Sequence, residues 1–215
     1  MNKQKAIQAS SPPPRFAKER GATVTTSKSA IRLHDGTSAT SIGIDISQAT
    51  CPDRSYHAEL AGVVYENGTV KLLFGQETRN KKVRSLIEVS MSPRSVIQAL
   101  NAFNVIKHPS FEEIVLQMGE KIPTLYKFDE DPPEVARLKA NMLSMSADGT
   151  EASIDFFDAS PFTMANLQQN SSATSVNIVG VVRIDTQTAL VHALLLGLRK
   201  LSSQFPPQIT KLMEV

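Results

Sequence analysis

The feature that most constrains this chain is a pattern of strands, a tight turn and a helix that occurs twice along it. In the first occurrence, alternating isoleucines over 42–46 predict a half-buried strand. A second strand follows over 56–65 and a return strand over 70–74, with Asn67-Gly68 between them. Asn-Gly is a strong hairpin signal because both residues tolerate positive φ. A chain that repeats such a unit is expected to fold as two similar halves.

The first unit continues with a strand and a helix. The aliphatic residues of 83–91 favour a strand. Ser92-Pro93 is a helix cap followed by proline at the first helical position. Apolar residues then recur at helical spacing from Val96 to Phe103, until His108-Pro109 ends the pattern.

The second half repeats this order of elements. We expect a strand at 125–128, a connection over 129–137, a hairpin and a last strand over 176–184. In this alignment Met142, Ser144 and Ser146 replace Leu60, Gly62 and Val64, Asp148-Gly149-Thr150 replaces Asn67-Gly68-Thr69, Asp185 replaces the cap Ser92, and 190–194 replaces 96–100 after one inserted residue. Two unrelated strand-and-helix runs would give the same element order, and this alternative stays open.

We therefore predict an α+β protein of two tandem units, each with four antiparallel strands followed by a helix, that together form a pseudo-dimer. The predicted segments are a basic Ser/Thr/Pro-rich arm (1–40), a first unit (41–108), a helical connector (109–123) and a second unit (124–215). The connector begins with the capping box Ser110 to Glu113. Residues 1–30 hold six cations against Glu19 and three consecutive prolines, so alone they should be disordered or extended.

The second helix carries more apolar surface than one sheet needs to cover. Leucines at 190, 194, 198 and 201 form one stripe, and Ala189, Ala193 and Gly197 form a small-residue strip that would admit a close helix neighbour. Burial within the chain and an interface with another subunit both explain this surface.

No pattern in the chain indicates catalysis, a cofactor or a metal site. The four histidines lack metal-ligand spacing, Cys51 has no adjacent base, and the glycine-rich phosphate-binding patterns are missing. We therefore predict no catalytic, cofactor-binding or metal-binding residue. A single cysteine indicates a reducing compartment, and the most apolar stretch, 186–198, is shorter than the ~20 residues of a membrane span. These observations favour a cytoplasmic protein that does not bind membranes.

Two features could bind a partner. The loop 158–175 is long for a compact domain and contains Phe162, Met164 and Leu167, which either dock a protein or pack back on their own unit. The arm cations Arg15, Lys18 and Arg20 could grip neighbouring molecules. Nucleic-acid binding by the arm is a weaker possibility, because charge is present with little aromatic interleaving and the net charge is only +2.

The first unit also resembles a known family. The resemblance rests on an Ile-x-Ile strand, the following Tyr-x-Ala, the basic loop Lys81-Lys82-Val83-Arg84-Ser85 and Ser-Pro-Arg at the helix start. It covers 41–106 and, more faintly, 124–200, and it points to a short uncharacterised bacterial domain that normally occurs alone. That domain is similar in strand order to the SecB family of export chaperones, whose subunits pair through their sheets and helices. The resemblance implies a fold, and no SecB substrate-binding residue carries over to a position in this chain.

The sequence thus predicts a non-enzymatic interaction protein, a SecB-like chaperone or adaptor that holds a protein partner and is oligomeric. The first alternative is a structural subunit of a virion or secretion-type assembly, in which the arm makes lattice contacts. The second alternative is a nucleic-acid-associated protein.

Overall fold

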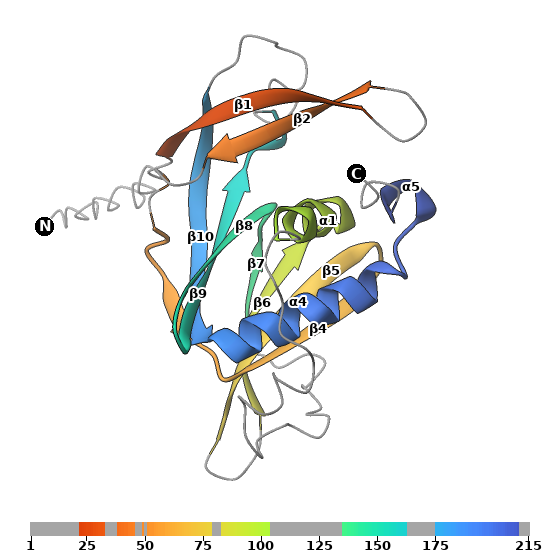
Figure 1. Cartoon of the computed structure of the whole chain (residues 1–215). Helices are drawn as coiled ribbons and strands as arrows, with labels where there is room; N and C mark the ends of the chain where they lie inside the picture. Colours follow the sequence, from red (N-terminus) through yellow and green to blue (C-terminus); the bar gives the residue numbers. More distant parts are fainter. Residues whose placement is uncertain are drawn as a thin grey trace, which may run out of the picture.

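The computed structural model describes residues 22–32, 38–45, 49, 51–78, 83–103, 135–162 and 175–210. The chain is an α+β protein with two sheets and few helices (Figure 1). Its strands are β1 Ala22–Arg32, β2 Ser38–Asp45, β3 Ser55–His57, β4 Leu60–Glu66, β5 Thr69–Glu77, β6 Val83–Met91, β7 Ala136–Lys139, β8 Met142–Asp148, β9 Glu151–Ala159 and β10 Ser175–Gln187. Its helices are α1 Pro93–Ala102, α4 Thr188–Ser202 and α5 Pro207–Thr210.

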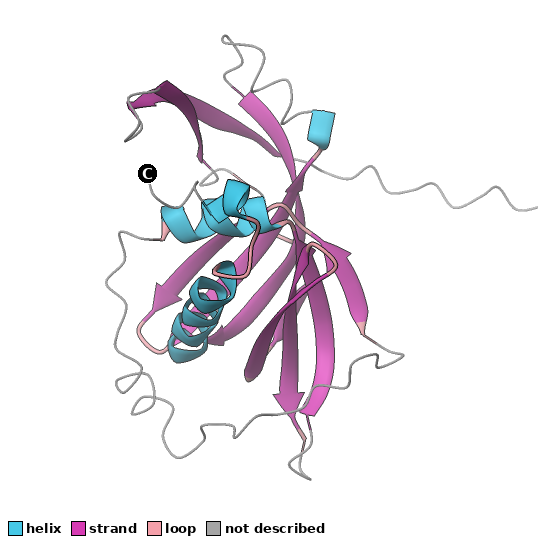
Figure 2. Cartoon of the chain, turned by 90° about the vertical axis from the view of Figure 1, so that its right-hand side faces the viewer, coloured by secondary structure: helices cyan, strands magenta, loops and turns pink. Residues whose placement is uncertain are grey.

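The strands form a larger and a smaller sheet. The larger sheet has six strands in the order β2-β1-β10-β9-β8, with β3 also paired to β10. The smaller sheet has four strands in the order β4-β5-β6-β7. Figure 2 shows the longer helices gathered on one side of the fanned strands.

Both sheets are mixed, so the prediction of purely antiparallel units is wrong in one respect. β3 runs parallel to β10, and β7 runs parallel to β6. Each of these short strands continues directly into the other sheet, and the chain changes sheet at a buried alanine, Ala58 or Ala140. The N–H of Ala58 donates to the carbonyl of Asp185 (2.9 Å), and the N–H of Ala140 donates to that of Ser90 (3.1 Å). The two sheets are therefore interlocked.

The two hairpins share one register. Leu60 faces Gly75 in the first hairpin, and the residues 82 positions later, Met142 and Phe157, face each other in the second. This confirms the predicted match of 142–146 with 60–64. At the turns the match shifts by one residue, because Gly149 (φ 63°) takes the place of Asn67 (φ 50°) and not that of Gly68.

The helices begin where the last strand of each half ends. Ser92 caps α1 as predicted, since its Oγ accepts a hydrogen bond from the Ser95 N–H at 3.1 Å. The prediction that Asp185 caps the second helix is wrong, because Asp185 lies within β10 and Gln187 is the cap residue of α4. Counted from the observed caps, Val96 and Val191 are both the fourth residue of their helices, so the predicted match of 190–194 with 96–100 is displaced by one residue.

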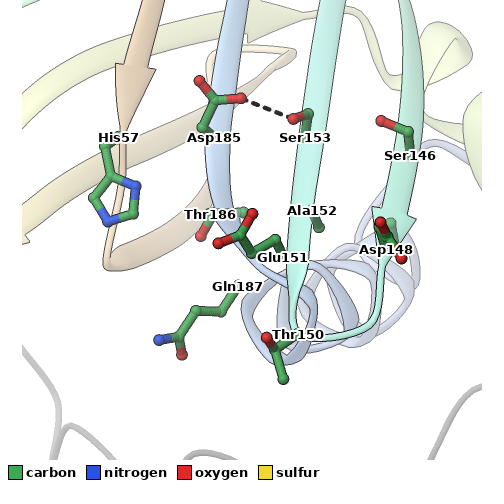
Figure 3. Close-up of a pocket in the computed structure, with 11 residues that line it drawn as sticks. His57, Ser146, Asp148, Thr150, Glu151, Ala152, Ser153, Asp185, Thr186 and Gln187 are labelled. Atoms are coloured by element: carbon green, nitrogen blue, oxygen red, sulfur yellow. Dashed lines mark hydrogen bonds between the residues drawn. The ribbon is translucent and has the colours of Figure 1, made fainter.

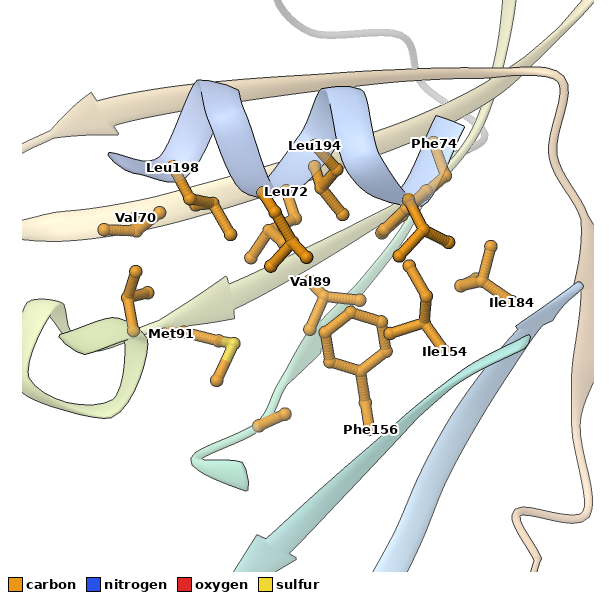
Figure 4. Packing of buried hydrophobic residues seen from close by; sticks show 14 of the residues in the cluster. Val70, Leu72, Phe74, Val89, Met91, Ile154, Phe156, Ile184, Leu194 and Leu198 are labelled. Atoms are coloured by element: carbon orange, nitrogen blue, oxygen red, sulfur yellow. The ribbon is translucent and has the colours of Figure 1, made fainter. Parts of the chain in front are cut away.

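One apolar core joins the two sheets and the helices. Phe74 of β5 and Phe156 of β9 meet edge to face with ring centroids 5.9 Å apart. Around them converge buried side chains of β5, β6, β9, β10 and α4 (Figure 4). Three leucines of the apolar stripe of α4 are buried inside the chain: Leu190, Leu194 and Leu198. Their burial favours internal packing over a subunit interface. At about 1.5–3 kcal/mol for each large side chain fully buried, this core is the main source of stability.

α4 packs on a strand of the other sheet. A Cβ added to Gly197 would lie 3.2 Å from Cγ2 of Val63 in β4. Gly197 of the small-residue strip therefore makes room for a side chain of a strand. We expected a neighbouring helix in this place. α4 also touches α1, β9 and β10, so it bridges both sheets.

Several predicted elements differ from the structure or lie outside the described residues. The strand predicted at 42–46 corresponds to β2, which pairs with β1 in the larger sheet and not within its own unit. Residues 22–32 of the predicted arm form β1, where we expected disorder in isolation. The strand at 125–128 and the connector 109–123 lie outside the described residues.

Candidate functional site

The predicted docking loop begins at a side chain that is open to solvent. Phe162 is 76% exposed, the larger exposure of the two large hydrophobic residues found exposed in the described part of the chain. The other predicted contact residues, Met164, Leu167, Arg15, Lys18 and Arg20, lie outside the described residues. The structure therefore locates one of the six predicted binding residues, at the root of the loop.

The stem below Phe162 is held by a side-chain clamp. The Asn141 side chain accepts a hydrogen bond from the Ala159 N–H at 2.9 Å and donates one to the Ala159 carbonyl at 2.6 Å. Ala159 is fully buried and also faces Ile178 of β10. Two residues, Ser160 and Pro161, separate this fixed point from Phe162, so the aromatic ring lies close to a backbone position that is held on both sides.

A second candidate is an open polar depression of about 540 Å³ on the outer face of the larger sheet, near the β8–β9 turn. A row of side chains crosses four strands there: His57 of β3, Asp185 of β10, Ser153 of β9 and Ser146 of β8 (Figure 3). Asp148 and Glu151 lie beside the turn and add negative charge. This end of the sheet is acidic.

Hydrogen bonds and an ion pair order this outer face. Ser153 Oγ donates to the carboxylate of Asp185 at 2.7 Å. Arg183 donates to both carboxylate oxygens of Asp155 at 2.7 Å, a bidentate pair. These hydrogen bonds raise the pKa of Arg183 above its ordinary value, and burial opposes the rise. The guanidinium is therefore charged at every physiological pH.

In the depression the Ser153 hydroxyl donates its hydrogen bond to Asp185, whereas the serine of a catalytic triad donates to a histidine that a carboxylate orients. In the described segments, no group of three or more His, Cys, Asp or Glu side chains is placed to hold a metal ion. The geometry here supports polar contacts to a ligand or solvent.

Cys51 lies in the loop before β3, next to Pro52. Its thiol is exposed and contacts the carbonyl of Pro52 at 3.6 Å. Pro52 packs so closely on Gly180 that a Cβ there would lie 2.9 Å from the Pro52 Cα. A larger residue at position 180 would clash with Pro52, which explains why β10 has glycine where its register with β9 is irregular.

Sequence reasoning missed the residues that organise these surfaces. Asn141 was not singled out, and neither was the Arg183–Asp155 pair. Opposite charges at alternating strand positions are a signal for such a pair, but only the register shows that the two positions face each other.

Family models, curated proteins and solved structures gave no match to the chain. Among the described helices, none has the length and apolar character needed to cross a membrane.

Proposed function

We propose that the chain is an internal pseudo-dimer, formed by duplication of one SecB-like unit. The support is a set of features that occur at corresponding positions of the two halves. A similar order of strands and helices would not by itself produce them. Both central strand pairs have an irregularity at the same place, between Phe74 and Gly75 in β5 and opposite Phe156 and Phe157 in β9. These positions are 82 residues apart, as in the hairpins.

A second coincidence concerns side-chain hydrogen bonds. Glu59 accepts a bond from the N–H of Glu77 at 2.9 Å. Asn141 and Ala159, each 82 positions later, make the same bond at 2.9 Å. The bonds from the Ala58 and Ala140 amides, which tie each short parallel strand to the opposite sheet, also correspond. β3 of the first unit pairs with the sheet of the second, and β7 of the second unit pairs with the sheet of the first. A dimer of two separate copies would exchange these strands in the same way.

We further propose that the protein is non-enzymatic, works in the cytoplasm and holds a protein partner, as a SecB-like chaperone or adaptor. The observation that carries this proposal is Phe162, exposed at 76% on a clamped stem. An exposed aromatic side chain on a rigid base contributes apolar contact at low entropic cost. The loop that follows would supply Met164 and Leu167 to the same contact.

Aggregation of a chemically unfolded test protein measures this activity directly. The full chain should suppress light scattering at stoichiometric amounts, and Phe162→Ser with Leu167→Ser should abolish the suppression. Phe162→Ser alone should change the free energy of unfolding by less than about 0.5 kcal/mol, because the ring is exposed. Val64→Ser, at the other exposed large hydrophobic residue (42%), is the matched control and should keep full activity.

Two results would count against partner holding. One is full suppression by the Phe162→Ser, Leu167→Ser variant. The other is a stability loss of several kcal/mol in that variant, which would assign these residues to the core.

A further inference from the structure

We propose that β8 is an assembly edge, which pairs antiparallel with β8 of a second copy of this chain. β8 is the last strand of the larger sheet, and within the described part of the chain it pairs with β9 alone. Its seven register pairs run from Met142 to Asp148 without an irregularity. It therefore presents an unbroken row of backbone donors and acceptors at the sheet edge.

β8 lacks the devices that normally protect such an edge. From Met142 to Ala147 it has no charge, no proline and no bulge. β7, an edge of the smaller sheet, has exposed Arg137 and Lys139. An unguarded flat edge leads to aggregation unless the native assembly covers it.

β4, the corresponding strand of the first half, is also the last strand of its sheet, but its inner face is covered within the chain. α4 packs on β4 with Gly197 against Val63, and Phe205 meets Tyr65 edge to face at 5.1 Å. Ala147 lies 82 positions after Tyr65, and it is exposed. Leu143 and Met145 on the same face are only partly buried. Within the described residues, the inner face of β8 thus has apolar atoms at the edge and no aromatic cover like that of β4.

The occupant we infer is a second copy, because β8 is complementary to itself. A two-fold axis at Met145 would pair Leu143 with Ala147 of the second copy on the inner face. On the outer face it would pair Ser144 with Ser146, a cross-strand pair that favours hydrogen bonding. No charge would face a like charge in this register, since Asp148 would lie opposite Met142. Such an isologous contact closes as a dimer.

Sedimentation of the full chain over a range of concentrations tests this. Wild type should be a closed dimer, and Ser144→Lys with Ser146→Lys should weaken dimerisation by about tenfold or more, because two pairs of like charges would face each other. Both side chains are on the outer face and Ser146 is exposed, so the thermal unfolding midpoint should stay near that of wild type. Val64→Lys, 82 positions before Ser146, is the matched control and should keep the dimer.

A charge-swap experiment separates pairing at β8 from indirect effects. The Ser144→Glu, Ser146→Glu variant should dimerise as weakly as the lysine variant, and mixing the two should restore a mixed dimer. Three results would overturn the proposal: monomeric wild type at the highest attainable concentration, dimerisation of the lysine variant as strong as that of wild type, and open-ended growth with concentration. The test does not depend on partner holding, because it uses no client protein.

Discussion

The hairpins in the two halves of the molecule have the same register. The halves differ in which side chains cover these strands. Tyr65 of the first half has an aromatic cover, whereas Ala147 in the same place is exposed. α1 has 10 residues, and α4 has 15 and reaches across to the other sheet. The comparison teaches that the two halves have the same strand pairing. Individual side chains decide which parts of each sheet are covered and which are exposed. The first half is covered by α4 and Phe205 of the second half, whereas the second half has the exposed Phe162 and, within the described residues, no such cover on β8.

The largest expected effect tests whether the halves form one cooperative unit. Phe74→Ala and Phe156→Ala should each lower the free energy of unfolding by about 3–5 kcal/mol, because both rings are fully buried. The double variant should lose less than the sum, since the rings contact each other. Denaturant unfolding measures the losses, and hydrogen exchange should show both sheets losing protection together. Loss of protection in one sheet only would mean independent halves.

The next effect contrasts corresponding positions of β6 and β10. Gly180→Ala should destabilise by about 1–3 kcal/mol, because the new Cβ would meet the backbone of Pro52 at 2.9 Å. Ser85→Ala should change stability by less than about 0.5 kcal/mol, since a Cβ is already present at that position. Chemical denaturation of both variants gives the difference. Equal effects would contradict the role assigned to Pro52.

A smaller effect compares the two side-chain clamps. Asn141→Ala removes two hydrogen bonds from a partly buried site and should cost about 1–2 kcal/mol. Glu59→Ala removes one bond from an exposed site and should cost less than about 0.5 kcal/mol. Because Asn141 holds the stem of Phe162, its loss should also weaken client holding, and Glu59→Ala should not. Unaltered holding by Asn141→Ala would show that the stem is fixed by other contacts.

The smallest effect is an exposed ion pair of the first half, Lys71 with Glu66, whose places in the second half are held by Ser153 and Asp148. The hydrogen bond from Lys71 to Glu66 (2.7 Å) lowers the pKa of Glu66 below its ordinary 4.5. The contribution of Glu66 to stability is therefore present above pH 4.5 and is lost as the pH falls through the lower folded value. In an NMR titration Lys71→Met should return the Glu66 pKa toward 4.5. A Glu66 pKa that does not move would exclude Lys71 as the cause.

Local signals predicted the elements well where they were strong. Asn67-Gly68 predicted the first hairpin turn, Ser92-Pro93 predicted the start of α1, and 83–91 matches β6 residue for residue. The alignment failed by one residue at Gly149 and by two at Asp185, since turn chemistry and cap chemistry are similar at neighbouring positions. For the candidate site, the sequence predicted the loop that contains Phe162. It did not predict the Asn141 clamp, which depends on a contact with a residue 18 positions away.

The sequence by itself determined that the chain has strands, turns and helices in a repeated order, because periodicity and turn residues act over a few neighbours. Only the tertiary structure decided which sheet each strand joins. β3 and β7 are short, and their hydrogen-bond partners lie in the distant half of the chain. The residues next to β3 and β7 in the sequence do not encode these partners. The partners depend on how the buried faces of the two sheets pack together, as at the contact of Phe74 with Phe156.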